Sequence, residues 1–347
     1  MDNFEEYLRQ GEPDKVEKAK IWKTAIGLQQ VDGLKPSDYL IDVAKQNIDG
    51  EISIEEVKLK IDSYYQQHPT KNNENRTEEA DKVSARIAEI LNENTFSFSP
   101  IEYLTIHRRL FDGIYNFAGK IRDYNITKKE WVLNSETVLY ASAESIKDTI
   151  EYDFEQEKKF VYKGLNSEEI IEHIALFTSN LWQIHVFGEG NTRTTAIFII
   201  KYLRKLGFKQ VNNDLFAKNS WYFRNALVRA NFEDISKGVF KTNEYLIKFL
   251  SNLLVETKFP LKNREIHIEP VKAKNEPVNE LVNEPVFCLI QKNPKITIQQ
   301  ISTQLNLSTS TIKRKIQLLK QKNIIQRVGS DKTGYWEIVT ESMKYKD

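Results

Sequence analysis

The chain has few of the residues that mark secreted, metal-rich or membrane proteins. Its 347 residues include one cysteine, Cys288, which rules out an internal disulfide and a cysteine-rich metal site. The longest apolar run, residues 196–200, is far shorter than the roughly 20 residues that a membrane span needs. The N-terminus is acidic and lacks the apolar core of a signal peptide. These absences predict a cytoplasmic protein with no membrane partner, and a buried Cys288.

The chain also lacks a bulk charge, but its charges are unevenly distributed. Fifty basic and 49 acidic residues leave a formal net charge of +1. Residues 287–347 contain 11 Lys or Arg and four Asp or Glu, a net charge of +7, so the first 286 residues carry −6. A chain of this length usually forms two or three domains. We therefore expect a basic C-terminal domain beside a mildly acidic body.

Most of the body has the pattern of α-helices. Gly33 and Pro36 end a helical stretch that starts near Lys15, and Ser53 opens another helix as its N-cap. Residues 121–133 break the helical period and predict a short β-hairpin. The predicted fold class is therefore all-α with a short β-hairpin flap, followed by a small C-terminal α+β domain.

The composition changes along the chain predict four segments. Glu-Pro-Val recurs three times within residues 258–286, among Lys and Asn, as in an extended linker. Two short amphipathic helices, a strand, a turn and a second strand follow, which is the order of a winged helix-turn-helix. The predicted segments are an N-terminal helical module (1–75), the main helical domain (80–256), the linker (258–286) and the winged helix-turn-helix (287–340).

A nine-residue loop between two apolar helices, residues 185–193, carries the clearest chemical signal. Its sequence is His-Val-Phe-Gly-Glu-Gly-Asn-Thr-Arg. The backbone N–H groups of Gly190, Asn191 and Thr192 would lie at a helix N-terminus, which is an anion-binding position. Arg193 adds a permanent positive charge there. The pattern predicts a phosphate site.

Two further residues of the loop suit phosphate chemistry. Glu189 supplies a hard oxygen that fits Mg²⁺ together with phosphate oxygens. His185 has a side chain whose pKa suits removal of a hydroxyl proton at neutral pH. Each residue alone would more often be structural, because a histidine at a helix end and a Gly-Asn turn are common. Together they predict phosphoryl or nucleotidyl transfer.

The loop resembles the Fic-domain motif, His-x-Phe-x-(Asp/Glu)-Gly-Asn-(Gly/Lys)-Arg. It matches at His185, Phe187, Glu189, Gly190, Asn191 and Arg193. The resemblance covers about residues 80–256 and implies the Fic fold. Proteins of this family use ATP bound to Mg²⁺ and transfer its AMP group to a hydroxyl side chain of a target protein.

The resemblance implies a role for each matched residue. His185 would deprotonate the target hydroxyl, and Glu189 would hold Mg²⁺. Gly190, Asn191 and Thr192 would line the anion hole, Arg193 would bind phosphate, and Phe187 would anchor the loop. The flap would hold the target through Asn125, Ile126, Thr127 and Lys128.

Two positions depart from the family pattern. Thr192 stands where the family has Gly or Lys, and we expect its branched side chain to crowd the phosphates. Ala196 stands where members that transfer AMP carry a second arginine, which contacts the γ-phosphate. One charge-assisted contact of about 1.5–3 kcal/mol is therefore missing. This leaves open whether ATP or another nucleotide is the donor.

The N-terminal segment resembles the VbhA-type antitoxin modules that partner Fic toxins. Those modules present (Ser/Thr)-x-x-x-Glu-(Gly/Asn), in which the Glu pairs with the second arginine. Asp32 and Gly33 stand in the Glu-Gly position here, whereas Leu28 replaces the Ser/Thr. Since the second arginine is absent, we expect no strong partner for Asp32. A toxin–antitoxin type of inhibitory segment and a plain helical cap both remain open.

The C-terminal domain has basic residues at the positions of a DNA reader. Its second helix carries Thr311, Lys313, Arg314 and Lys315, and Lys332 lies in the wing. This arrangement of basic residues predicts binding to DNA. The alternative is a protein-docking module with a solvated basic face.

Two functions follow from these observations. The first is a protein adenylyltransferase that uses ATP as co-substrate and Mg²⁺ as cofactor on an unidentified hydroxyl-bearing target protein. The alternative is a DNA-binding transcriptional regulator whose Fic core binds nucleotide without efficient transfer. The sequence leaves open whether the protein forms a homo-oligomer.

Overall fold

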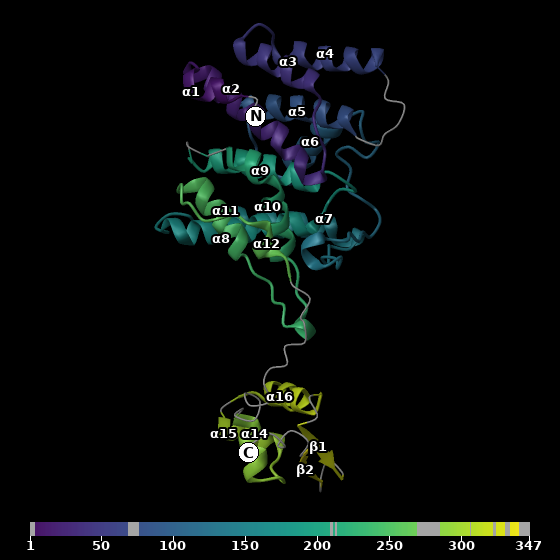
Figure 1. The fold of residues 1–347 in the computed structure, drawn as a ribbon, viewed down its shortest axis with the longest axis vertical. Helices are drawn as coiled ribbons and strands as arrows, with labels where there is room; N and C mark the ends of the chain where they lie inside the picture. Colours follow the sequence, from purple (N-terminus) through teal and green to yellow (C-terminus); the bar gives the residue numbers. More distant parts are fainter. Residues whose placement is uncertain are drawn as a thin grey trace, which may run out of the picture. The chain divides into compact units, whose positions relative to one another are not determined.

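The computed structural model describes residues 4–68, 76–208, 211, 214–268, 285–305, 307–321, 324–329 and 334–339. The chain divides into two compact units, residues 1–269 and 270–347 (Figure 1). Each unit has its own hydrophobic core. None of the described helices is long and apolar enough to cross a bilayer.

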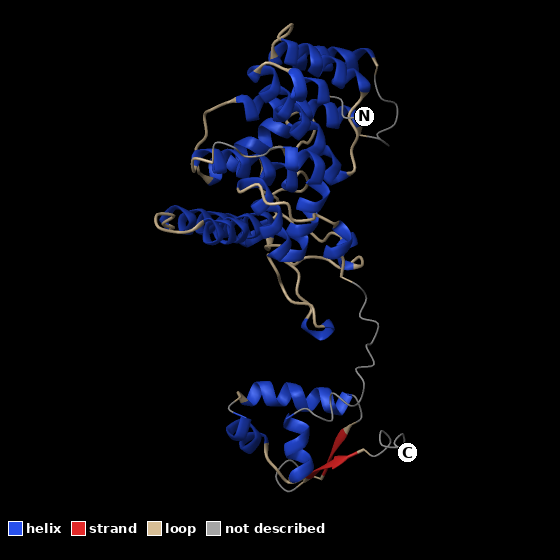
Figure 2. Ribbon diagram, turned by 60° about the vertical axis from the view of Figure 1, so that its left-hand side comes forward, coloured by secondary structure: helices blue, strands red, loops and turns tan. Residues whose placement is uncertain are grey.

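The first unit is built from packed helices (Figures 1 and 2). In chain order they are α1 (Glu5–Gln10), α2 (Pro13–Gly27), α3 (Asp38–Asp49), α4 (Ile54–Gln67), α5 (Thr77–Asn92), α6 (Pro100–Phe111), α7 (Ile146–Lys159), α8 (Ser167–Ile184), α9 (Asn191–Lys205), α10 (Asp214–Ala230), α11 (Glu244–Leu254) and α12 (Asn263–Ile266). In Figure 1, α9 lies between α1–α6 on one side and α8, α10 and α11 on the other. Residues 191–203 of α9 are all buried, as expected for a central helix.

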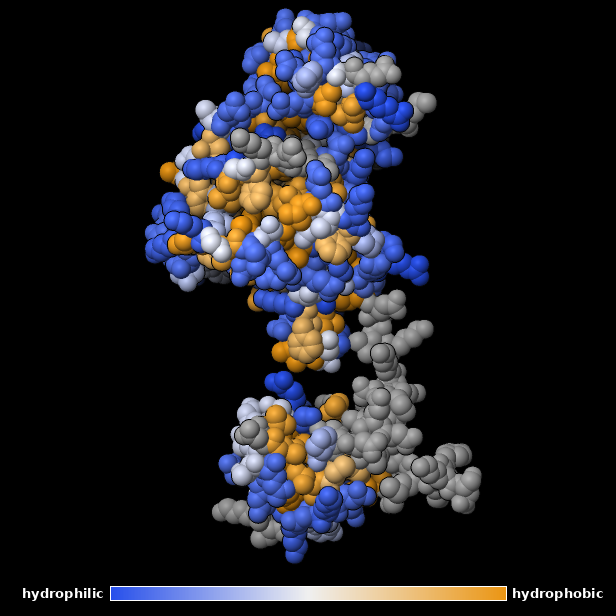
Figure 3. Space-filling model, turned by 90° about the vertical axis from the view of Figure 1, so that its left-hand side faces the viewer, coloured by the Kyte–Doolittle hydropathy of each residue, from blue (hydrophilic) through white to orange (hydrophobic). Residues whose placement is uncertain are grey.

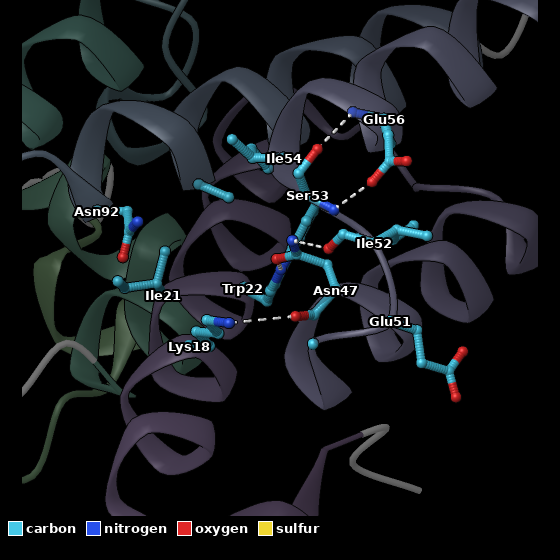
Figure 4. Close-up of a pocket in the computed structure, with 12 residues that line it drawn as sticks. Lys18, Ile21, Trp22, Asn47, Glu51, Ile52, Ser53, Ile54, Glu56 and Asn92 are labelled. Carbon is cyan, nitrogen blue, oxygen red and sulfur yellow. Dashed lines mark hydrogen bonds between the residues drawn. The ribbon is translucent and has the colours of Figure 1, made fainter.

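The N-terminal helices share one core with the helices that follow them. The Trp22 indole N–H donates to Asn47 Oδ1 at 3.0 Å, and the Asn47 amide donates to the Ile52 carbonyl at 3.0 Å (Figure 4). These bonds connect α2 to the α3–α4 turn beside a cavity of about 400 Å³. Ser53 and Glu56 cap α4 reciprocally, as the sequence predicts. Residues 4–68 thus belong to the first compact unit.

The surface of the first unit varies along its length. On the face that Figure 3 shows, mostly hydrophilic side chains cover the N-terminal end, and apolar side chains gather over the middle of the unit. In the vertical direction that Figures 1 and 3 share, this apolar area lies at the height of α9 and the helices next to it.

The predicted flap is present as a loop, without the expected β-strands. The described residues 121–141 contain no strand, only a 3-10 turn at Trp131–Leu133. The two arms meet where Glu130 N donates to the Glu136 carbonyl at 2.9 Å. Elsewhere the backbone groups of the arms form hydrogen bonds with side chains. Lys128 N, for example, donates to Thr137 Oγ1. A regular ladder between the arms does not form for that reason.

The predicted linker begins later than expected. Residues 258–268 pack on the first unit through α12, where Ile266 is buried, and Ile268 N donates to the Val132 carbonyl at 2.9 Å. These contacts hold residues 263–268 against the first unit, despite the polar composition of the stretch. The rest of the predicted linker up to residue 284 lies outside the described residues.

The second unit is a winged helix. It contains α14 (Pro285–Lys292), α15 (Ile298–Leu305), α16 (Thr309–Gln321), β1 (Ile325–Val328) and β2 (Tyr335–Ile338). The strands pair antiparallel, with Ile325 opposite Ile338. The core includes Ile312 and Trp336. The predicted fold class is confirmed, although Cys288 is only partly buried rather than fully buried.

Candidate active site

His185 lies at the end of α8 in a left-handed conformation, with φ of 51° and ψ of 59°. Such a conformation is uncommon for residues other than glycine and has to be held by neighbours. The Arg122 side chain holds it by donating from Nε to the His185 carbonyl at 2.7 Å. The same guanidinium donates to the Tyr124 and Ala141 carbonyls of the flap. Arg122, which the sequence did not single out, therefore connects both flap arms to the loop.

The imidazole of His185 is buried, with 3% of the residue exposed, and neither ring nitrogen has a hydrogen-bond partner among the described residues. Its ring lies against Tyr140, with 4.1 Å between the ring centroids, and against the edge of Trp182. Burial lowers the pKa of His185 well below its usual value of 6.5, and the charge of Lys128 lowers it further. The ring is therefore neutral at pH 7 and can accept a proton.

The residues after His185 form a tightly bonded turn around Phe187. Asn191 Oδ1 accepts from Phe187 N at 3.0 Å, and Asn191 Nδ2 donates to the Phe187 carbonyl at 2.7 Å. The His107 ring stacks on the Phe187 ring at 3.6 Å. Because His107 Nδ1 accepts from Gly119 N, His107 Nε2 carries the proton and donates to the Glu189 carbonyl at 3.0 Å. His107 thus braces the loop, a role that the sequence did not reveal.

Gly190 and Thr192 sit at the N-terminus of α9. Gly190 has φ of 79°, and a Cβ atom there would come within 2.4 Å of the Phe111 ring, so the position requires glycine. The first-turn N–H groups that follow have no partner within the helix. The Thr192 hydroxyl accepts from the Trp182 indole N–H at 3.0 Å. The side chain that we expected to crowd the phosphates is instead held against α8.

Glu189 faces a lysine of the flap. Lys128 Nζ lies 3.3 Å from Glu189 Oε2 and 3.4 Å from Oε1. The described residues contain no cluster of three or more His, Cys, Asp or Glu side chains that could hold a metal. One carboxylate together with nucleotide phosphates is a common way to bind Mg²⁺, so the donor set fits that ion. Lys128 would have to leave Glu189 for the ion to bind.

Arg193 is completely buried and points into the body of the first unit. Its guanidinium donates to Glu79 Oε1 at 2.8 Å and to Gln29 Oε1 at 3.0 Å, and it lies over the Phe111 ring. Asp32 Oδ2 is 2.8 Å away, an ion pair whose angle is poor for a hydrogen bond. The expectation that Asp32 lacks a strong partner is therefore wrong. The reason is that Arg193, rather than a second arginine, faces this carboxylate.

Glu79 joins the N-terminal residues to the active-site helix. It accepts from Arg76, from Tyr115 and from Arg193. Burial alone would raise the pKa of Glu79, but the hydrogen bond from Arg76 and the charge of Arg193 outweigh it and lower the pKa. Glu79 is ionised at neutral pH as a result. The sequence gave no signal for it, because Glu79 and Arg193 are 114 residues apart.

The other predicted flap residues lie near the loop without forming one contact surface. Asn125 Oδ1 accepts from Ala143 N at 2.9 Å, which closes the flap on itself. Ile126 is partly buried against the core, and Thr127 is exposed. Thr127 and the Asn125 amide nitrogen are exposed and have no side-chain hydrogen-bond partner among the described residues.

An ion pair connects the turn of the flap to α10. Arg224 Nη1 lies 2.7 Å from Glu130 Oε2, and the Glu130 side chain is almost fully buried. The Tyr140 hydroxyl donates to Glu130 at 3.3 Å. Tyr140 is therefore fixed by this pair while its ring covers His185.

Comparison with protein families matches the two parts of the chain separately. Residues 97–203, which include the loop, match the model of the Fic/DOC family. The chain carries a Fic domain. Residues 286–326 match a winged helix-turn-helix DNA-binding family. The predicted combination of a Fic protein with a C-terminal helix-turn-helix is confirmed.

The chain is similar to two known proteins. It is 28% identical over 183 residues to the protein adenylyltransferase VbhT of Bartonella schoenbuchensis, a match that covers 47% of this chain. The matched part is 36% of VbhT, so the chain spans about a third of that relative's length. A Fic family protein of Desulfovibrio desulfuricans G20 superimposes with a TM-score of 0.47 at 12% identity, over 98% of this chain and 93% of the other.

The winged helix exposes part of the predicted DNA-binding set. Lys313 and Arg314 are exposed on α16, while Thr311 and Lys315 are partly buried. Lys332 lies outside the described residues. The apolar side of α16 packs into the core of the second unit, so the basic residues face away from that core.

Proposed function

We propose that this Fic protein is a protein adenylyltransferase, which transfers AMP from ATP to a hydroxyl side chain of a target protein. The observation that carries the proposal is the buried, unpartnered imidazole of His185 beside the N-terminus of α9. A buried polar group without a partner is costly unless a ligand completes it. The name of the relative VbhT, a protein adenylyltransferase, agrees with this activity.

The chain's own residues account for the steps of this reaction. A ring nitrogen of neutral His185 takes the proton of the target hydroxyl, and the oxygen forms a bond to the α-phosphorus. The bond between that phosphorus and the bridging oxygen breaks, and pyrophosphate leaves. The free N–H groups of Asn191 and Thr192 stabilise the negative phosphate oxygens. Mg²⁺ held by Glu189 would neutralise phosphate charge.

The positive charge that the family places at the second arginine needs another source here. Ala196 is buried and uncharged, and Arg193 is occupied by Asp32 and Glu79. Lys128 is the flap cation that already reaches the proposed metal ligand, Glu189. We assign it the phosphate contact, to be made once it leaves that carboxylate. In this proposal Lys128 binds the nucleotide rather than the target protein.

The N-terminal helices have a regulatory part in this proposal. Asp32 comes from the module proposed at residues 1–75, Glu79 from α5, and both hold the arginine of the Fic domain proposed at 80–256. While they do so, the guanidinium is not available to a phosphate. Residues 4–68 would therefore restrain nucleotide binding, in keeping with the resemblance of Asp32 and Gly33 to inhibitory segments.

Labelling with radioactive ATP tests the activity. The protein is incubated with α-labelled ATP and Mg²⁺, alone and with a cell lysate, and labelled protein is detected after electrophoresis. His185→Ala should abolish labelling and leave nucleotide binding intact, because it removes the base and no phosphate contact. The exposed His68→Ala is the matched control and should label normally. Normal labelling by His185→Ala would contradict the assignment.

A DNA-binding regulator whose Fic core binds nucleotide without efficient transfer is the second candidate. The occupied Arg193 and the exposed Lys313 and Arg314 favour it. In that case nucleotide would change DNA affinity while no label is transferred. Exchange of both basic residues for alanine should weaken DNA binding and reduce its salt dependence.

A further inference from the structure

A cavity beside the flap adjoins the active site. It has a volume of about 380 Å³ and lies between the second flap arm, α7 and α8. Tyr140 lines it, and the ring of Tyr140 also lies against the His185 ring. Ile184, the residue before His185, lines it as well. The Tyr140 ring therefore lies between a group bound in this cavity and His185, the proposed base.

One carboxylate in this cavity has no partner. Asp153 of α7 lines the cavity and makes no hydrogen bond or ion pair with a described residue. Burial alone raises its pKa to about 6. The hydroxyl of Thr149, one turn earlier, donates to the Ser145 carbonyl, and the Gln183 amide donates to the Leu139 carbonyl. These two donors are engaged, and neither Asp153 nor the Asn180 amide, which also lines the cavity, forms a hydrogen bond with a described residue, so the carboxylate is open to a donor from outside.

The charge around the cavity selects the kind of partner. Asp153 is the one charged residue among those that line the cavity, and residues 143–172, which include α7 and the first turn of α8, carry a net charge of −5. A carboxylate in an acidic segment attracts a cationic side chain and disfavours an anionic ligand. The cavity is too open at the flap edge to be a core void, since Leu139 beside it is 83% exposed. A segment of another protein can lie across it.

We propose that this cavity receives a lysine or arginine side chain of the target protein, with Asp153 as its counter-ion. The target segment would run along the second flap arm, so that its hydroxyl residue reaches His185 while a nearby basic residue enters the cavity. This inference rests on the proposed function and adds to it the substrate class: segments in which a basic residue accompanies the modified hydroxyl.

Peptide arrays test this preference directly. Peptides with one central Ser, Thr or Tyr carry Lys, Arg, Ala or Glu at each neighbouring position, and α-labelled ATP reports transfer. We expect at least one position at which Lys or Arg raises labelling about tenfold over Ala, the effect of one charge-assisted contact. Asp153→Asn should remove the preference and leave labelling of the alanine peptides unchanged. Asp148→Asn, an exposed acid on the same helix, is the matched control and should keep it.

Binding of the same peptides separates failure of this inference from failure of the proposed function. Fluorescence anisotropy with wild type and Asp153→Asn needs no transfer. Tighter binding of Lys peptides to wild type alone supports the inference even if no peptide is labelled, an outcome that would count against the transferase. Equal binding of Lys and Ala peptides to wild type, or a preference that survives Asp153→Asn in a folded protein, would overturn the inference.

Discussion

Replacement of Asp32 by alanine is the substitution whose outcome depends most on the contacts around Arg193. Asp32→Ala removes one of two carboxylates from a guanidinium that is fully buried, and it leaves the bonds to Glu79 and Gln29 in place. The fold should therefore be retained. A nucleotide phosphate that binds Arg193 then has to displace one ion pair fewer.

The size of the effect follows from the geometry of that ion pair. Charge-assisted contacts contribute about 1.5–3 kcal/mol, and the poor angle at Asp32 places this one near the lower limit. A difference of about 1.4 kcal/mol is a tenfold change in a dissociation constant. We therefore expect Asp32→Ala to bind ATP with Mg²⁺ about tenfold more tightly than wild type.

Isothermal titration calorimetry with ATP and Mg²⁺ measures this change. The exposed Asp42→Ala, an equal loss of charge in the N-terminal helices, is the matched control and should match wild type. Unchanged affinity in Asp32→Ala would show that Arg193 takes no part in nucleotide binding. Weaker binding would show that Asp32 positions Arg193 for the nucleotide instead of withholding it. Either result would refute the proposed restraint.

Three further predictions concern the cations and the base of the site. Lys128→Ala should weaken ATP binding about tenfold and AMP binding much less, whereas its exposed neighbour Lys129→Ala should do neither; equal loss for both nucleotides would remove Lys128 from the terminal phosphates. Glu79→Ala should destabilise the protein by about 3–5 kcal/mol in urea unfolding, because it leaves a buried arginine short of a partner; a change below 1 kcal/mol would contradict that. The acid limb of the pH–rate profile should lie below pH 6.5, because the pKa of His185 is lowered and the ring stays neutral until the pH falls further; a limb above that pH would contradict the burial argument.

Local patterns in the sequence predicted the parts of the fold that neighbouring residues determine. The Ser53 cap and the left-handed Gly33 that ends the first helical stretch are set within a few residues. The Fic loop was found for the same reason, because its six matching residues lie within nine consecutive positions. The spacing of apolar residues also predicted the order of helices and strands in the winged helix.

Contacts between distant segments could not be predicted in this way. Arg193 meets Glu79 and Gln29 across 114 and 164 residues, and no local pattern links them. The absence of a second arginine suggested that Asp32 had no partner, whereas packing of the N-terminal helices brings it to Arg193. The flap failed as a hairpin because Arg122 and Thr137 bond to its backbone, which depends on tertiary packing.

The position of the label in the donor tests the central claim most directly. The protein is incubated with ATP labelled either at the α-phosphate or at the γ-phosphate, with a lysate or a peptide array as acceptor, and released pyrophosphate is measured. AMP transfer predicts that the α-label enters protein, that the γ-label does not, and that one pyrophosphate appears for each label incorporated; His185→Ala should show none of this. Incorporation of the γ-label, or nucleotide binding without any incorporation by the wild-type protein, would contradict the account.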